Sequence, residues 1–65
     1  DTVKPLIAVL KDGDDTAKQR AAFTLGRLGS GASDALPELK SIAESTDNVV
    51  LRDTVNFAID AIQGN

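Results

Sequence analysis

The residues of this 65-residue chain that could do chemistry lie mainly in a glycine-rich string, GRLGSG at residues 26–31. Glycine-rich turns next to a helix can cradle a phosphate with their backbone N–H groups. A Walker-type phosphate loop, however, needs Lys and then Ser or Thr after its last glycine, and a strand before its first. Here no Lys follows the last glycine, and helical spacing precedes the first. We therefore interpret the string as a helix end, in which Gly26 lets a neighbouring helix approach, Gly29 closes the helix in left-handed conformation, and residues 30–33 form a loop.

Three nearby aspartates, Asp12, Asp14 and Asp15, have the spacing of a calcium-loop start. An EF-hand loop also needs Gly at its sixth position and Glu at its twelfth. Counted from Asp12, these positions hold Ala17 and Phe23. We therefore assign the aspartates to helix capping and predict no metal site.

The composition argues against catalysis and against several kinds of ligand. The chain has no Cys and no His, which excludes thiol chemistry and the usual zinc ligands. No Ser lies near a plausible base, so we expect no enzyme, no catalytic residue and no cofactor. The net charge is −3 with the acids spread along the chain, which opposes nucleic-acid binding.

Nothing in the sequence predicts a membrane segment or a secretory leader, so we expect a soluble protein, cytoplasmic by default. The chain begins at Asp1 and contains no Met. We therefore expect it to be a piece of something longer or a small subunit held in an assembly.

Apolar residues recur along the whole chain at the three- and four-residue spacing of amphipathic helices. This spacing predicts helices at 2–12, 14–28, 34–44 and 48–63. The connections between them are short, so consecutive helices should pack antiparallel.

Residues suited to starting and ending helices stand between the apolar stripes of these predicted helices. The expected N-caps are Thr2, Asp14, Asp34 and either Asp47 or Asn48. The expected closing residues are Gly13, Gly29 and Gly64.

The helix pair occurs twice. Pro5 and Pro37 are 32 residues apart, and in the second helix of each pair the offset becomes 34, which pairs Phe23 with Phe57. The change in offset falls in the loop between helices, where insertions are tolerated. A repeated helix pair of this length is typical of an α-solenoid.

The segment PLIAVLKDGDDTAKQRAAFTLGRLG resembles the short bacterial HEAT-like repeat, a helix pair also found in phycobilin lyases. The matching positions are Pro5, Leu6, Asp12, Asp14, Lys18, Ala21, Ala22, Leu25, Gly26, Leu28 and Gly29. The second copy matches less well, at Pro37, Leu39, Ile42, Asn48, Arg52, Ala58, Ile59 and Ile62, with Asp60 and Gln63 in place of the two glycines.

The resemblance implies an all-α fold: an α-solenoid fragment of two antiparallel helix hairpins, stacked as HEAT-like repeats. We place a first repeat at 2–31 and a second at 34–64, in one domain over 1–65. The resemblance also implies that the chain is a protein–protein interaction scaffold or adaptor within a longer array or assembly. The alternative is a regulatory or substrate-holding part of a bilin-lyase-type enzyme. DNA binding, a third reading, is opposed by the net charge.

The candidate partner surface has an apolar part and a polar part. Phe23 and Phe57 lie off the main stripes, and Val50, Phe57 and Ala61 form a second apolar face of the last helix. We expect Phe23 to pack into the second repeat and Phe57 to await a third repeat, a partner protein or a second copy of the chain, giving self-association through the fourth helix. The polar part comprises residues that we place on the outer side of the second helix of each pair: Lys18, Arg27, Arg52, Asn56 and Asp60.

Overall fold

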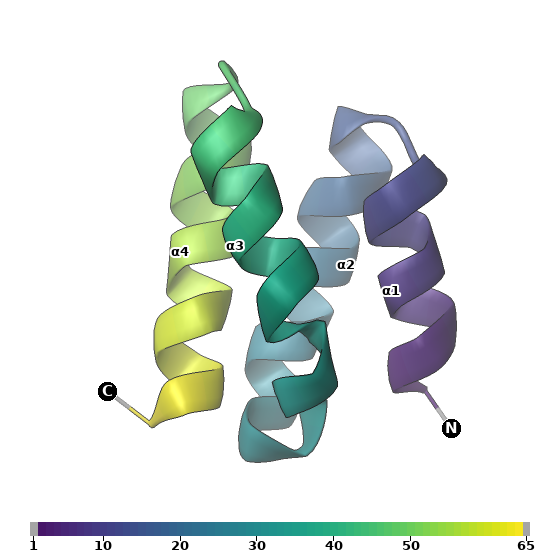
Figure 1. Cartoon of the computed structure of the whole chain (residues 1–65), viewed down its shortest axis with the longest axis vertical. Helices are drawn as coiled ribbons and strands as arrows, with labels where there is room; N and C mark the ends of the chain where they lie inside the picture. Colours follow the sequence, from purple (N-terminus) through teal and green to yellow (C-terminus); the bar gives the residue numbers. More distant parts are fainter. Residues whose placement is uncertain (1, 65) are drawn as a thin grey trace.

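The computed structural model describes residues 2–64, and every regular element in that range is helical. The elements are α1 (Val3–Asp12), α2 (Asp15–Leu28), the 3₁₀ helix η1 (Gly29–Ala35), α3 (Leu36–Ser45) and α4 (Val49–Gln63). Because η1 follows α2 and precedes α3 without a gap, residues 15–45 form one continuous helical stretch with a kink inside η1. Figure 1 shows α1 and α3 running in one direction and α2 and α4 in the other, so consecutive α-helices are antiparallel.

Two of the expected N-caps are confirmed. The Asp14 side chain accepts a hydrogen bond from the Ala17 backbone N–H at 2.8 Å, and the Asn48 side chain accepts one from Leu51 at 3.1 Å. Each bond satisfies one of the donors that a helix start leaves unpaired. Thr2 stands at the N-cap of α1 but makes no such bond with its side chain.

The expected loop at residues 30–33 is wrong, as is the expected cap Asp34. Residues 29–35 form η1, and the N-cap of α3 is Ala35, which has no capping side chain. Ala32 and Ala35 are both buried. The backbone kinks at Ala32, with φ −103° and ψ 19°, and the segment places both small side chains in the core.

Gly29 closes α2, though not in the left-handed helical conformation expected of it. Its φ is +67° and its ψ is −141°, and its N–H donates to the Gly26 carbonyl. Gly13 and Gly64 end α1 and α4 as expected, and Gly64 alone has a left-handed helical backbone.

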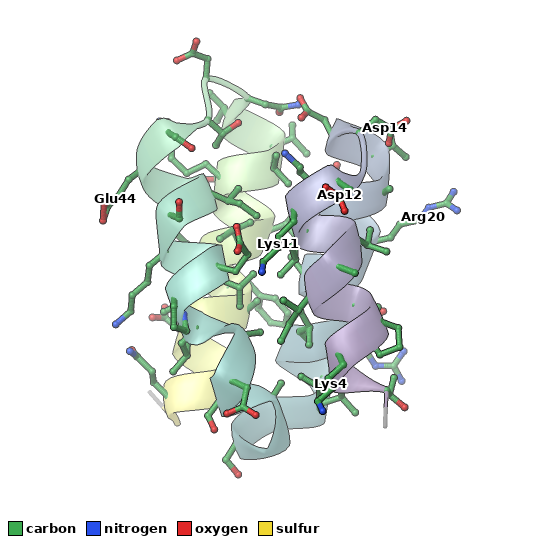
Figure 2. The ribbon with its side chains drawn as sticks, turned by 45° about the vertical axis from the view of Figure 1, so that its right-hand side comes forward. Lys4, Lys11, Asp12, Asp14, Arg20 and Glu44 are labelled. Carbon is green, nitrogen blue, oxygen red and sulfur yellow. The ribbon has the colours of Figure 1, made fainter. Side chains whose placement is uncertain are left out.

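The core is made of small and aliphatic side chains from every helical element. The fully buried residues with the largest side chains are Leu10, Leu25, Leu39, Leu51 and Val55. No polar or charged side chain within residues 2–64 is buried. Most charged side chains instead project into solvent, as Arg20 and Glu44 do in Figure 2.

The parallel helices α2 and α4 make the most extensive contact in the molecule. Gly26 is buried there, and a β-carbon on it would lie 2.8 Å from Phe57 Cε2 and 3.1 Å from Ala58 Cα. The expected close approach at Gly26 is therefore confirmed. At the other end of the pair, the Asn48 amide Nδ2 donates to Asp15 Oδ2 at 3.1 Å.

Burial in α2 and α4 corresponds better at an offset of 33 residues than at the offset of 34 expected from the sequence. At 33, buried Ala22 pairs with buried Val55, and buried Leu25 with buried Ala58. At 34, buried Gly26 would pair with exposed Asp60. Phe23 and Phe57 are thus not equivalent positions, and exposed Leu28 does not continue the core stripe of α2. The boundary expected between repeats, at residues 31 to 34, falls inside η1.

Candidate functional site

Two aromatic rings meet on the surface between α2 and α4. The Phe23 and Phe57 rings stack with their centroids 5.8 Å apart and their planes at 24°. Each side chain nevertheless stays about half exposed, at 49% for Phe23 and 46% for Phe57. Offset stacking stabilises such a pair beyond the area it buries, so the rings hold a defined apolar platform on the surface.

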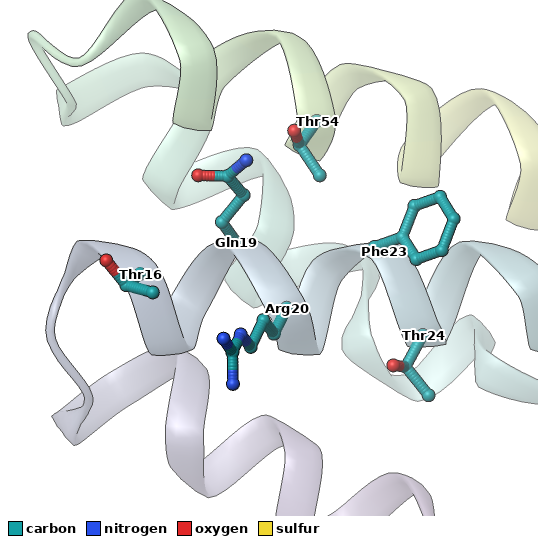
Figure 3. Close-up of a pocket in the computed structure, with 6 residues that line it drawn as sticks. All are labelled: Thr16, Gln19, Arg20, Phe23, Thr24 and Thr54. Atoms are coloured by element: carbon teal, nitrogen blue, oxygen red, sulfur yellow. The ribbon is translucent and has the colours of Figure 1, made fainter.

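A groove runs along this surface beside the rings. It has a volume of about 440 Å³ and is lined by Thr16, Gln19, Arg20, Phe23, Thr24 and Thr54. In Figure 3, Gln19 of α2 and Thr54 of α4 point toward each other across it, whereas Arg20 points away from α4. A smaller hollow of about 280 Å³ continues past Phe57 and Asp53. The groove offers hydroxyl, amide, guanidinium and aromatic contacts.

The apolar part of the expected surface lies together on one flank of α4. Val50, Phe57 and Ala61 are spaced by seven and then four residues, which places them on one side of the helix. Val50 is 58% exposed, and Ala61 is half-buried. This flank faces α2, because Phe57 covers Gly26 and stacks on Phe23. The expectation that the Phe57 ring waits uncovered for a third repeat is therefore wrong in part, because one side of the ring already contacts α2.

The polar part does not form one surface, contrary to expectation. Lys18 and Arg27 are nine residues apart, which is two and a half helical turns, so they lie on opposite sides of α2. Lys18 shares the core side with Leu25 and is half-buried, whereas Arg27 is exposed.

On α4 the expected polar residues do lie together. Arg52, Asn56 and Asp60 are spaced by four residues and are all exposed. They form an outer strip of the helix, of which Asp60 is the member nearest to the side that carries Phe57.

Two further charged residues belong to this surface but are not among the predicted partner-surface residues. Arg20 stands seven residues before Arg27 on the exposed side of α2, and Asp53 stands seven before Asp60 on the exposed side of α4. Seven residues make nearly two helical turns, so each pair shares one face. The seven-residue spacing of like charges around each Phe is the signal that could have revealed them.

We call the surface formed by these exposed residues the α2–α4 face. Its residues are Thr16, Arg20, Phe23 and Arg27 of α2 and Val50, Asp53, Phe57 and Asp60 of α4. It carries positive charge along α2, negative charge along α4 and the aromatic pair between them.

Metal-binding groups are not assembled anywhere in residues 2–64: no three carboxylates there come close enough to hold an ion. None of the helices there has the length and the apolar character that crossing a membrane requires.

The chain matches no protein-family model, and comparison with curated proteins and with solved structures likewise finds no match. The HEAT-like resemblance therefore rests on the residues that carry it.

Proposed function

We propose that this chain is a protein-interaction module of the HEAT-like repeat kind and that its partner binds to the α2–α4 face. The exposed, stacked pair of Phe23 and Phe57 is the observation that carries the proposal. Aromatic side chains are enriched at the centres of protein interfaces, because they bury a large area at a small cost in conformational entropy.

The packing of the helices supports the HEAT-like part of the proposal. In an up-down-up-down bundle the parallel helices lie diagonally, whereas here the parallel pair α2 and α4 has the most extensive contact and α1 also contacts α3. Side-by-side parallel helices are what stacked helix hairpins produce. The α2–α4 face would then belong to the layer formed by the second helix of each hairpin.

The distribution of polar groups supports binding by complementarity of shape and charge. The face combines an apolar centre with charged residues at its edges, which is the usual anatomy of a protein interface. A partner would bury the two rings at the centre and meet arginines on one side and aspartates on the other.

The proposal is tested by making the face polar without disturbing the core. Val50→Asp places a charge on an exposed residue of the face, and Ala8→Asp makes the same kind of change on an exposed position of α1. In extracts of the cells that make the protein, we expect the unaltered chain and the Ala8→Asp variant to migrate in an assembly larger than one chain. We expect Val50→Asp to migrate as a smaller species.

Circular dichroism of the purified variants provides the control for folding, since both should keep the helical signal of the unaltered chain. Equal migration of all three proteins would argue against binding through the α2–α4 face.

A further inference from the structure

We propose that the α2–α4 face is self-complementary and binds a second copy of this chain. The inference rests on the proposed binding role of this face and names its partner. It follows from where the charged residues stand along the two helices.

The arginines of α2 and the aspartates of α4 lie at matching levels of the parallel pair. The Asp15–Asn48 hydrogen bond joins residues 33 apart, and the Phe23–Phe57 stack joins residues 34 apart. The backbone approach of Gly26 to Ala58 joins residues 32 apart. Residues of α2 and α4 that differ by about 33 therefore lie at the same level along the pair. Arg20 and Asp53 differ by 33, and so do Arg27 and Asp60.

This arrangement selects one symmetry for a dimer. A two-fold axis parallel to the helices, lying between two facing copies, places α2 of each copy over α4 of the other at the same level. Arg20 then meets Asp53 of the second copy, Arg27 meets Asp60, and the Phe23 and Phe57 rings of both copies meet at the centre. A two-fold axis across the helices would instead place arginine over arginine, which like-charge repulsion disfavours.

The exposed apolar side chains provide the centre of this interface. Phe23, Phe57 and Val50 are each close to half exposed or more, and a second copy would cover all three. The molecule measures only 27 × 24 × 16 Å, so the contact area is at the small end for specific complexes. We therefore expect association in the micromolar range or weaker.

Charge reversal tests the pairing directly. The first variant carries Arg20→Glu and Arg27→Glu, and the second carries Asp53→Lys and Asp60→Lys. All four positions are exposed, so both variants should keep the circular dichroism of the unaltered chain. In sedimentation equilibrium we expect the unaltered chain to dimerise. Each variant alone should associate at least about tenfold more weakly, because two-fold symmetry turns four attractive charge pairs of the dimer into repulsive ones.

Mixing the two variants is the decisive measurement, since it restores opposite charges across the interface. The equimolar mixture should dimerise about as strongly as the unaltered chain. The inference is overturned if the unaltered chain stays monomeric to millimolar concentration, if either variant dimerises as strongly as the unaltered chain, or if the mixture stays monomeric. A monomeric chain whose assembly in cell extracts is still lost with Val50→Asp would overturn this inference and leave the proposed function standing.

Discussion

The Phe57 ring lies directly over Gly26, so close that a β-carbon at residue 26 would approach Cε2 to 2.8 Å. The backbone of α4 is nearly as close, since Ala58 Cα would lie 3.1 Å from the same atom. Gly26 thus serves two purposes: it lets α2 and α4 approach, and it provides the floor on which the Phe57 ring rests beside Phe23.

Replacing Gly26 by Leu should therefore destabilise the fold. The ring can move aside but the Ala58 backbone cannot, so overpacking should lower the free energy of unfolding by about 1–3 kcal/mol. Chemical denaturation followed by circular dichroism measures this change. Thr24→Leu is the matched control, because Thr24 is exposed on the same helix and should change stability by less than about 0.5 kcal/mol. Equal stability of the two variants would contradict the close approach.

Replacing the capping residue Asp14 by Ala should lower the stability of the fold more than replacing Asp34 by Ala. Asp14→Ala deletes the acceptor that binds the Ala17 N–H at 2.8 Å, and such a loss costs about 1 kcal/mol. Asp34 lies within η1 and caps no helix, so Asp34→Ala should be nearly neutral. Thermal unfolding should show a drop of several degrees for the first variant only. A larger drop for Asp34→Ala would indicate that Asp34 caps α3 after all.

Gly29 and Gly31 should respond differently to alanine. Gly29 has a φ of +67°, which disfavours any residue with a β-carbon, whereas Gly31 has no positive φ, and both sites have room for a methyl group. Gly29→Ala should thus lower the free energy of unfolding by about 1 kcal/mol or more through backbone strain alone. Gly31→Ala, which meets no strain, should leave it unchanged or slightly raised. Urea denaturation of the two variants side by side measures the difference, and equal midpoints would contradict the assigned backbone at Gly29.

Local chemistry explains which features could be predicted from the sequence. The caps at Asp14 and Asn48 follow from side-chain preferences at helix starts, and the close approach at Gly26 follows from a glycine on a core stripe. These features depend on residues within one or two turns. They can be recognised without knowing how the helices pack.

The features that were missed depend on contacts between distant segments. η1 forms where Ala32 and Ala35 are buried in the shared core, and α4 is among the helices that contact this turn. A string of Gly, Ser and Asp predicts a loop when those contacts are unknown. An offset of 34 aligns residues of similar type along the two helices, including the two phenylalanines, whereas burial in the folded chain matches an offset of 33 better.

Only part of the candidate site could be predicted, because its arrangement also depends on how the helices pack. Phe23, Val50 and Phe57 were identified because they lie off the core stripes, and they meet on the α2–α4 face. Lys18 lies on the core side of α2 and is half-buried, although a basic residue is more often exposed. A long Lys stem can lie along apolar surface while its charged end reaches water.

The most direct measurement of the central claim is site-specific photo-crosslinking in the cells that make the protein. A photoreactive phenylalanine analogue replaces Phe57 on the α2–α4 face or, as a control, Lys40 on the exposed side of α3. The proposed function predicts covalent adducts of defined mass from position 57 and none of comparable yield from position 40. Adducts from position 40 alone, or equal yields from both positions, would contradict binding through the α2–α4 face.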